Sequence, residues 1–243
     1  MRSNIQLLVL TLLLALLPSC TPSDPSAQAT ATAETIAAAG TATAETIAAT
    51  QTAAAGVRIV ATATALQRQL GAPILGPKDG ELPLPDNNDN QISVYGDDAL
   101  RPADFIVEAT FANPYSADVN TWDYGFVFRS SQDDNDYRIV IASTQTWELV
   151  RAEDDGKKVN FTTVSSGSID GLNTGQNQTN SVRLVAIGPE GALFVNDRFV
   201  AALDLSDHTE AGSLLVGSGM TGGRTRDGSS TRYSKFTIWE VER

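Results

Sequence analysis

Polar and apolar residues alternate along most of the chain beyond residue 90, and the alternation is densest at 122–129. The aromatic residues of this run share one face of an extended chain: Trp122, Tyr124, Phe126 and Phe128. A period of two is typical of a β-strand with one buried face. We therefore predict that 122–129 is a central strand whose rings lie in the core.

Ten further short runs alternate in the same way and are separated by turn residues. They are Ile92–Tyr95, Asp104–Phe111, Tyr137–Ala142, Thr146–Arg151, Val159–Val164, Ser181–Ile187, Ala192–Val195, Arg198–Leu203, Ser213–Val216 and Tyr233–Val241. Hairpin turns are indicated at Asn196–Asp197, Pro189–Gly191 and Asp154–Gly156. About eleven strands are too many for one flat sheet of this length. The sequence thus predicts an all-β sandwich of two antiparallel sheets over residues 91–243.

The N-terminus follows a different pattern. Residues 5–17 are apolar except for Gln6 and Thr11, which is too short to span a membrane and indicates a signal peptide over residues 1–19. The run ends in Leu-Pro-Ser-Cys20, which resembles the lipobox of bacterial lipoprotein precursors, although Pro18 departs from it at the middle position. The resemblance implies a lipidated Cys20 and an extracytoplasmic protein anchored to the bacterial membrane or cell surface. An ordinary secretory signal is the alternative.

Cys20 is the only cysteine in the chain. An internal disulfide is therefore impossible, and an unpaired thiol in an exported protein needs an explanation. Acylation of Cys20 supplies one, because two or three acyl chains hold a protein on a membrane where one chain binds only marginally.

A spacer at residues 20–26 leads into an Ala/Thr-rich segment at 27–70. Thr30–Ala38 returns unchanged as Thr41–Ala49, an offset of eleven residues that matches three turns of a helix. We expect a helical stalk that self-associates along the stripe containing Ile36 and Ile47, with a flexible Thr/Ala tether as the alternative. The four prolines of residues 71–90 predict an irregular lead-in to the folded domain.

The formal net charge is -12, with 29 acidic and 17 basic residues. Nucleic acids and anionic lipid surfaces are bound by clustered lysine and arginine. The composition therefore argues against nucleic acid as a partner and suits an extracytoplasmic domain.

The order and spacing of several strands carry a resemblance. The runs 104–111, 122–129 and 137–141, followed by 180–186, 191–197 and 236–239, are similar to the concanavalin-A-like jelly roll. The similarity is to the lectin/glucanase and laminin-G-like superfamily, particularly to bacterial domains related to 3-keto-disaccharide hydrolase modules. It implies a jelly roll that binds carbohydrate or another component of the cell envelope.

Glycosidases use a pair of carboxylates, and on this fold the resemblance places both on one strand. No such pair occurs in the chain; the nearest substitute joins Asp123 to Glu108 or Glu148 on neighbouring strands. We therefore expect a binding module rather than an enzyme. A glycoside or keto-sugar hydrolase and a structural envelope protein without a small ligand are the alternatives.

If a sugar binds, Trp147 is the candidate stacking platform. Asp123, Arg129 and Arg138 are the candidate polar partners, since the alternation places them opposite the core rings. Core packing is the competing role for Trp147.

Two further polar features are weaker candidates for a functional site. Asp133, Asp134 and Asp136 form an acid-rich turn for which the resemblance implies one structural Ca²⁺, with a solvated hairpin turn as the alternative. His208, the only histidine, lies in a turn-rich segment and is expected to be a solvated loop residue. Metal sites built from histidine and cysteine are excluded by the count of these residues.

Overall fold

The computed structural model describes residues 71–84, 92–131, 135–220 and 229–242, together with Ala61 and Ala65. The signal peptide, Cys20 and nearly all of the stalk lie outside these ranges, so their assignments stay predictions. Ala61 and Ala65 are both α-helical. Within the described ranges, no helix has the length and apolar character needed to cross a membrane.

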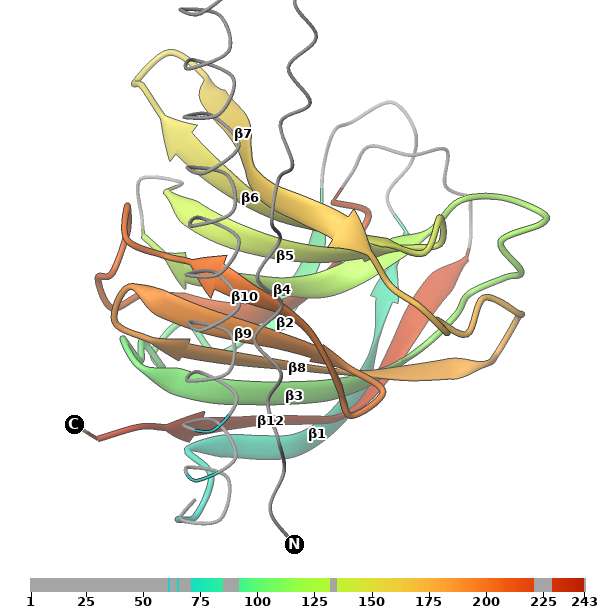
Figure 1. The fold of residues 1–243 in the computed structure, drawn as a ribbon, viewed down its shortest axis with the longest axis horizontal. Helices are drawn as coiled ribbons and strands as arrows, with labels where there is room; N and C mark the ends of the chain where they lie inside the picture. The colour runs from blue at the N-terminus through green and yellow to red at the C-terminus, as the bar shows by residue number, and fades with distance from the viewer. Residues whose placement is uncertain are drawn as a thin grey trace, which may run out of the picture. The chain divides into compact units, whose positions relative to one another are not determined.

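The described ranges contain twelve strands. They are β1 (Leu75–Pro83), β2 (Ser93–Gly96), β3 (Phe105–Ala112), β4 (Asp123–Ser130), β5 (Asp136–Ala142), β6 (Thr146–Asp154), β7 (Val159–Ser168), β8 (Thr179–Ile187), β9 (Glu190–Val195), β10 (Arg198–Asp204), β11 (Ser213–Ser218) and β12 (Ser230–Glu240). Sheet A has the order β1-β12-β3-β8-β9-β10 and sheet B the order β2-β11-β4-β5-β6-β7, with six strands each (Figure 1). The predicted all-β fold of two antiparallel sheets is confirmed.

The segment 122–129 occupies the interior position expected of it. Strand β4 lies between β11 and β5 in sheet B, and its alternate rings belong to the main core. Trp122 stacks on Tyr124 at 5.0 Å between ring centroids, and Tyr124 stacks on Phe111 of β3 at 4.5 Å. This stack joins the two sheets, because Phe111 belongs to sheet A and Tyr124 to sheet B. The alternation of aromatic residues therefore identified the face on which the sheets meet.

The expected irregular lead-in was wrong for Leu75–Pro83, which forms β1 at the edge of sheet A and pairs with β12. Proline breaks a strand only where its missing N–H is needed for pairing, and an edge strand leaves one side unpaired. Pro77 lies within a register shift between Leu75 and Lys78, and Pro83 is the last residue of the strand. The prolines thus mark a sheet edge rather than the absence of a strand.

The tight turn between β9 and β10 follows its sequence signal. Asn196 and Asp197 both adopt positive φ values, 51° and 62°, as a type I′ hairpin turn requires. The predicted hairpin is therefore confirmed, and it fixes the register of β9 and β10 in sheet A.

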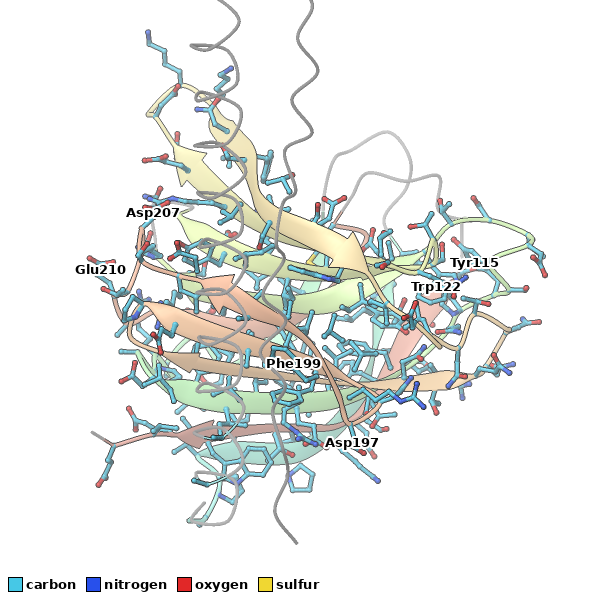
Figure 2. The ribbon with its side chains drawn as sticks, in the orientation of Figure 1. Tyr115, Trp122, Asp197, Phe199, Asp207 and Glu210 are labelled. Atoms are coloured by element: carbon cyan, nitrogen blue, oxygen red, sulfur yellow. The ribbon has the colours of Figure 1, made fainter. Side chains whose placement is uncertain are left out.

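A buried polar network holds one end of the sandwich, the end where Figure 2 shows Tyr115 and Trp122; Asp207 and Glu210 lie at the other end. The Asn180 amide donates to the Tyr124 hydroxyl at 2.7 Å and to the Asn173 carbonyl at 2.9 Å. The Tyr124 hydroxyl donates in turn to Asn113 at 3.1 Å. Burial raises the pKa of Tyr124, although the hydrogen bond from Asn180 acts in the opposite direction. The phenol therefore stays protonated and can donate.

Candidate functional site

The outer face of sheet B, which points away from sheet A, is the candidate site. Its residues are those that alternate with the core residues of the strands, and strand register aligns them in three rows. The rows are Gly125, Val140, Glu148 and Ser166; Val127, Arg138, Val150 and Thr163; and Asp136, Ala152 and Phe161. The face combines a small, aliphatic floor with carboxylate, guanidinium and hydroxyl groups.

Phe161 of β7 is the exposed aromatic ring of this face, with 58% of its surface accessible. The guanidinium of Arg138 lies over the ring, 4.8 Å from its centroid. Asp136 holds this guanidinium in place, because Arg138 Nε donates to Asp136 Oδ1 at 2.9 Å. The result is a positioned ring, with the exposed hydroxyls of Thr163 and Ser166 on the same strand.

A different arrangement covers the β4–β11 side of the face. Gly125 and Gly217 are directly paired, and the side chain of Met220 lies over them: added Cβ atoms would meet Met220 Cε at 3.4 Å and Sδ at 3.2 Å, respectively. The Met220 N–H donates to Asp123 Oδ1 at 2.7 Å. Asp123 thus positions the start of the β11–β12 connection at the edge of the outer face.

Gly125→Ala is expected to destabilise the domain by about 1–3 kcal/mol, because overpacking of this kind forces backbone shifts. The new Cβ would lie 1.9 Å from the backbone oxygen of Ile139, which has little freedom to move within the sheet. Gly217→Ala is the matched control, since its nearest contact is the thioether of Met220 at 3.2 Å. Urea denaturation of both variants checks the prediction; equal stability losses would contradict it.

The four predicted ligand residues are not brought together into one cluster. Trp147 packs in the main core and is only 6% exposed. Arg138 and Asp123 lie on the outer face of sheet B, but Asp123 is buried and bonded to the Met220 backbone. Of these four residues, Arg138 is in contact with an exposed ring, that of Phe161.

The placement of Arg129 differs from the expected outer face. Its backbone has a positive φ of 53°, and its side chain is fully buried. The guanidinium donates to three carbonyl oxygens: Ala103 at 3.1 Å, Gly188 at 2.8 Å and His208 at 2.9 Å. Asp104 lies 3.9 Å away. Arg129 therefore ties a strand of sheet B to loops that flank strands of sheet A.

His208 is also not the solvated loop residue that the sequence predicted. Its Nε2 lies 2.7 Å from the backbone oxygen of Arg129, and its Nδ1 lies 2.8 Å from Glu210 Oε2. The pKa of Glu210 is held below its usual value, first by the Glu210 backbone N–H and then by the charge of His208. The contact with Arg129 spans 79 residues of sequence, so no local pattern could have revealed it.

The candidate carboxylates come from three different strands and from both outer faces of the sandwich. Glu108 belongs to the outer face of sheet A, where it accepts from Arg183 Nε at 3.0 Å, so it lies on the opposite side of the sandwich from Asp123. Register places Asp123 and Glu148 two strands and two residues apart, a Cα separation of about 12 Å. Glycosidases hold their two carboxyl groups about 5–5.5 Å apart in retaining enzymes and about 6.5–9.5 Å apart in inverting ones.

Of the predicted calcium ligands, Asp133 and Asp134 lie outside the described residues. Asp136 is buried and pairs with Arg138. Among the residues that the structure describes, no three histidine, cysteine or acidic side chains gather as a metal site would require.

Comparisons with known proteins give similarities of structure. No protein-family model matches the chain, and no curated protein matches it in sequence. A carbohydrate-binding module, CBM66 from Bacillus subtilis, is 12% identical with a TM-score of 0.47, over 68% of this chain and 92% of that one. A fructosyltransferase from A. japonicus is 14% identical with a TM-score of 0.48, over 70% of this chain and 26% of that one.

Sheep galectin-11, in complex with glycerol, is 13% identical with a TM-score of 0.36, over 59% of this chain and 90% of that one. At these identities and TM-scores, neither a ligand nor a catalytic residue is carried over from these proteins to this chain.

Proposed function

We propose that this chain is a membrane-anchored, extracytoplasmic carbohydrate-binding module whose ligand surface is the outer face of sheet B. The observation that carries the proposal is the exposed ring of Phe161, positioned by the ion pair of Arg138 and Asp136. A preorganised aromatic ring offers apolar contact area to the C–H face of a sugar at little cost in side-chain entropy.

The polar residues of the same face fit such a ligand. Hydroxyls of Thr163 and Ser166 and the half-buried carboxylate of Glu148 can exchange hydrogen bonds with sugar hydroxyls. Val140 and Val150, which pair with Glu148 and Thr163 respectively, add apolar contact area for a ligand that lies across the strands. A neutral, hydroxyl-rich ligand suits this mixture better than a polyanion, because the chain carries a net charge of -12.

The anchoring part of the proposal rests on the sequence. Lipid at Cys20 and an Ala/Thr-rich stalk over residues 27–70 would present the domain at the membrane or cell surface. A component of the cell envelope is therefore within reach of the domain.

A glycan array tests the proposal. The full chain bearing Cys20→Ser is probed beside the Phe161→Ala variant, which is expected to weaken binding of any recognised glycan by about tenfold, the equivalent of about 1.4 kcal/mol. Phe199→Ala is the matched control, because Phe199 is a similarly exposed ring on the outer strand β10 of sheet A.

If Phe161→Ala and Phe199→Ala weaken glycan binding equally, the outer face of sheet B is not the ligand surface. Failure of the unmodified domain to bind any glycan would favour a structural envelope protein without a small ligand.

A further inference from the structure

An apolar row crosses the outer face of sheet A, the face turned away from sheet B. Strand register places one residue from each of five neighbouring strands side by side: Trp239 of β12, Ile106 of β3, Val185 of β8, Ala192 of β9 and Ala202 of β10. All five belong to a second hydrophobic cluster, separate from the main core. This row is apolar on all five strands, whereas each of the three rows on the outer face of sheet B contains a polar residue.

The middle of this row is shielded from water. Ile106 and Val185 are 1% exposed and Ala192 is fully buried, although all three point away from the main core. Aliphatic side chains on the outer face of a sheet lose contact with water only where other apolar groups pack on them, so this row belongs to a packed layer.

The polypeptide enters the domain at one end of the row. The Ile74 N–H donates to the Ile238 carbonyl at 2.9 Å, so Ile74 lies beside Trp239 on the outer face. Gly71 and Pro73 immediately precede it and allow the chain to change direction there. The segment that ends at Leu70 therefore reaches the sheet where the apolar row begins.

The residues before that point carry a matching stripe. With about 100° per residue, Ile59, Ala63, Leu66 and Leu70 fall within an arc of about 60° on an α-helix. Ala61 and Ala65 are helical and exposed, and on a helix of this geometry they fall on the side opposite the stripe. The stripe is therefore the side that remains for packing.

We propose that residues 57–70 pack as an α-helix across the outer face of sheet A, with the stripe of Ile59, Ala63, Leu66 and Leu70 on the row from Trp239 to Ala202. The end of the stalk is then part of the folded domain, and only the residues before it separate the domain from the membrane. This inference does not depend on carbohydrate binding, because it concerns the opposite face of the sandwich.

The dimensions agree. An α-helix rises about 1.5 Å per residue, and neighbouring strands lie about 4.8 Å apart. If Leu70 lies beside Trp239 of β12, Leu66 therefore lies about one strand away from β12, Ala63 about two strands away, and Ile59 between three and four strands away. Ile59 then lies between Ala192 and Ala202, whose small side chains leave room for it.

Disulfide trapping tests the proposal in the full chain bearing Cys20→Ser, so that the introduced thiols are the only ones. The Ile59→Cys/Ala202→Cys pair is expected to form an intramolecular disulfide on mild oxidation, identified by mass spectrometry of the linked peptides. Ala61→Cys/Ala202→Cys is the matched control, because Ala61 is two residues away but lies on the exposed side. This control pair is expected to cross-link at least tenfold more slowly.

Thermal unfolding gives a second readout that needs no cross-link. Leu66→Asp places a charge in the stripe and is expected to lower Tm by about 3 °C or more, whereas Ala65→Asp, on the exposed side, leaves Tm within about 1 °C. The proposal requires both differences. The proposal is overturned if the two cysteine pairs form disulfides at the same rate, or if the two aspartate variants have the same Tm. It is also overturned if the Ile59→Cys/Ala202→Cys chains form disulfide-linked dimers instead, because that result would assign the face to a second copy of the chain.

Discussion

Replacing Arg129 with methionine is expected to destabilise the domain by about 3–5 kcal/mol, the range found when one partner of a buried ion pair is removed. The guanidinium is fully buried and donates to the carbonyl oxygens of Ala103, Gly188 and His208. Methionine fills a similar volume but offers no donor, so these acceptors lose their partner in a place that water does not reach. The carboxylate of Asp104 would also lose its nearby cation.

Urea denaturation of Arg129→Met and of Arg232→Met measures this effect. Arg232 is exposed and donates to Asn177 at 2.8 Å, so its removal is expected to cost less than about 1 kcal/mol. A loss of stability no larger for Arg129→Met than for Arg232→Met would show that the buried guanidinium is not a structural tie.

Asn180→Ala is expected to destabilise the domain by about 2–4 kcal/mol, because it leaves two partly buried donors without an acceptor and the buried Tyr124 hydroxyl without a donor. Asn180 Oδ1 accepts from the Asn173 N–H and from Asn196 Nδ2, both at 2.9 Å. Its amide also donates to the Tyr124 hydroxyl, which connects strand β8 of sheet A to strand β4 of sheet B. Loss of this side chain therefore weakens both the β7–β8 loop and the contact between the sheets.

Asn160→Ala controls for the removal of an amide at the surface. Asn160, near the start of β7, donates to Asp155 of the exposed β6–β7 turn at 3.1 Å, so water replaces the lost contact and the expected cost is below about 1 kcal/mol. Thermal and urea unfolding of both variants provide the measurement. Similar stabilities for the two would mean that the buried network contributes no more than a surface hydrogen bond.

The positions of residues in sheet B show what the alternation of residue types in the sequence can predict and what it cannot. Alternation in the sequence identified the buried face of β4, and it also placed Arg138 correctly on the outer face of sheet B. It could not distinguish a ring that packs in the core, such as Trp147, from one that remains exposed, such as Phe161, because both alternate with a period of two. The choice depends on which neighbours cover each ring.

The eleven predicted strands, the Asn196–Asp197 turn and the two-sheet all-β class follow from the sequence alone, because period-two alternation and positive-φ turn residues are local properties. Strand order, the edge position of β1, the burial of Arg129 and the contacts of His208 follow only from the tertiary structure. Each of these depends on contacts between residues far apart in the chain, such as Arg129 and Gly188. The candidate ligand surface also depends on the tertiary structure, since strand pairing between β5, β6 and β7 brings Arg138 to Phe161.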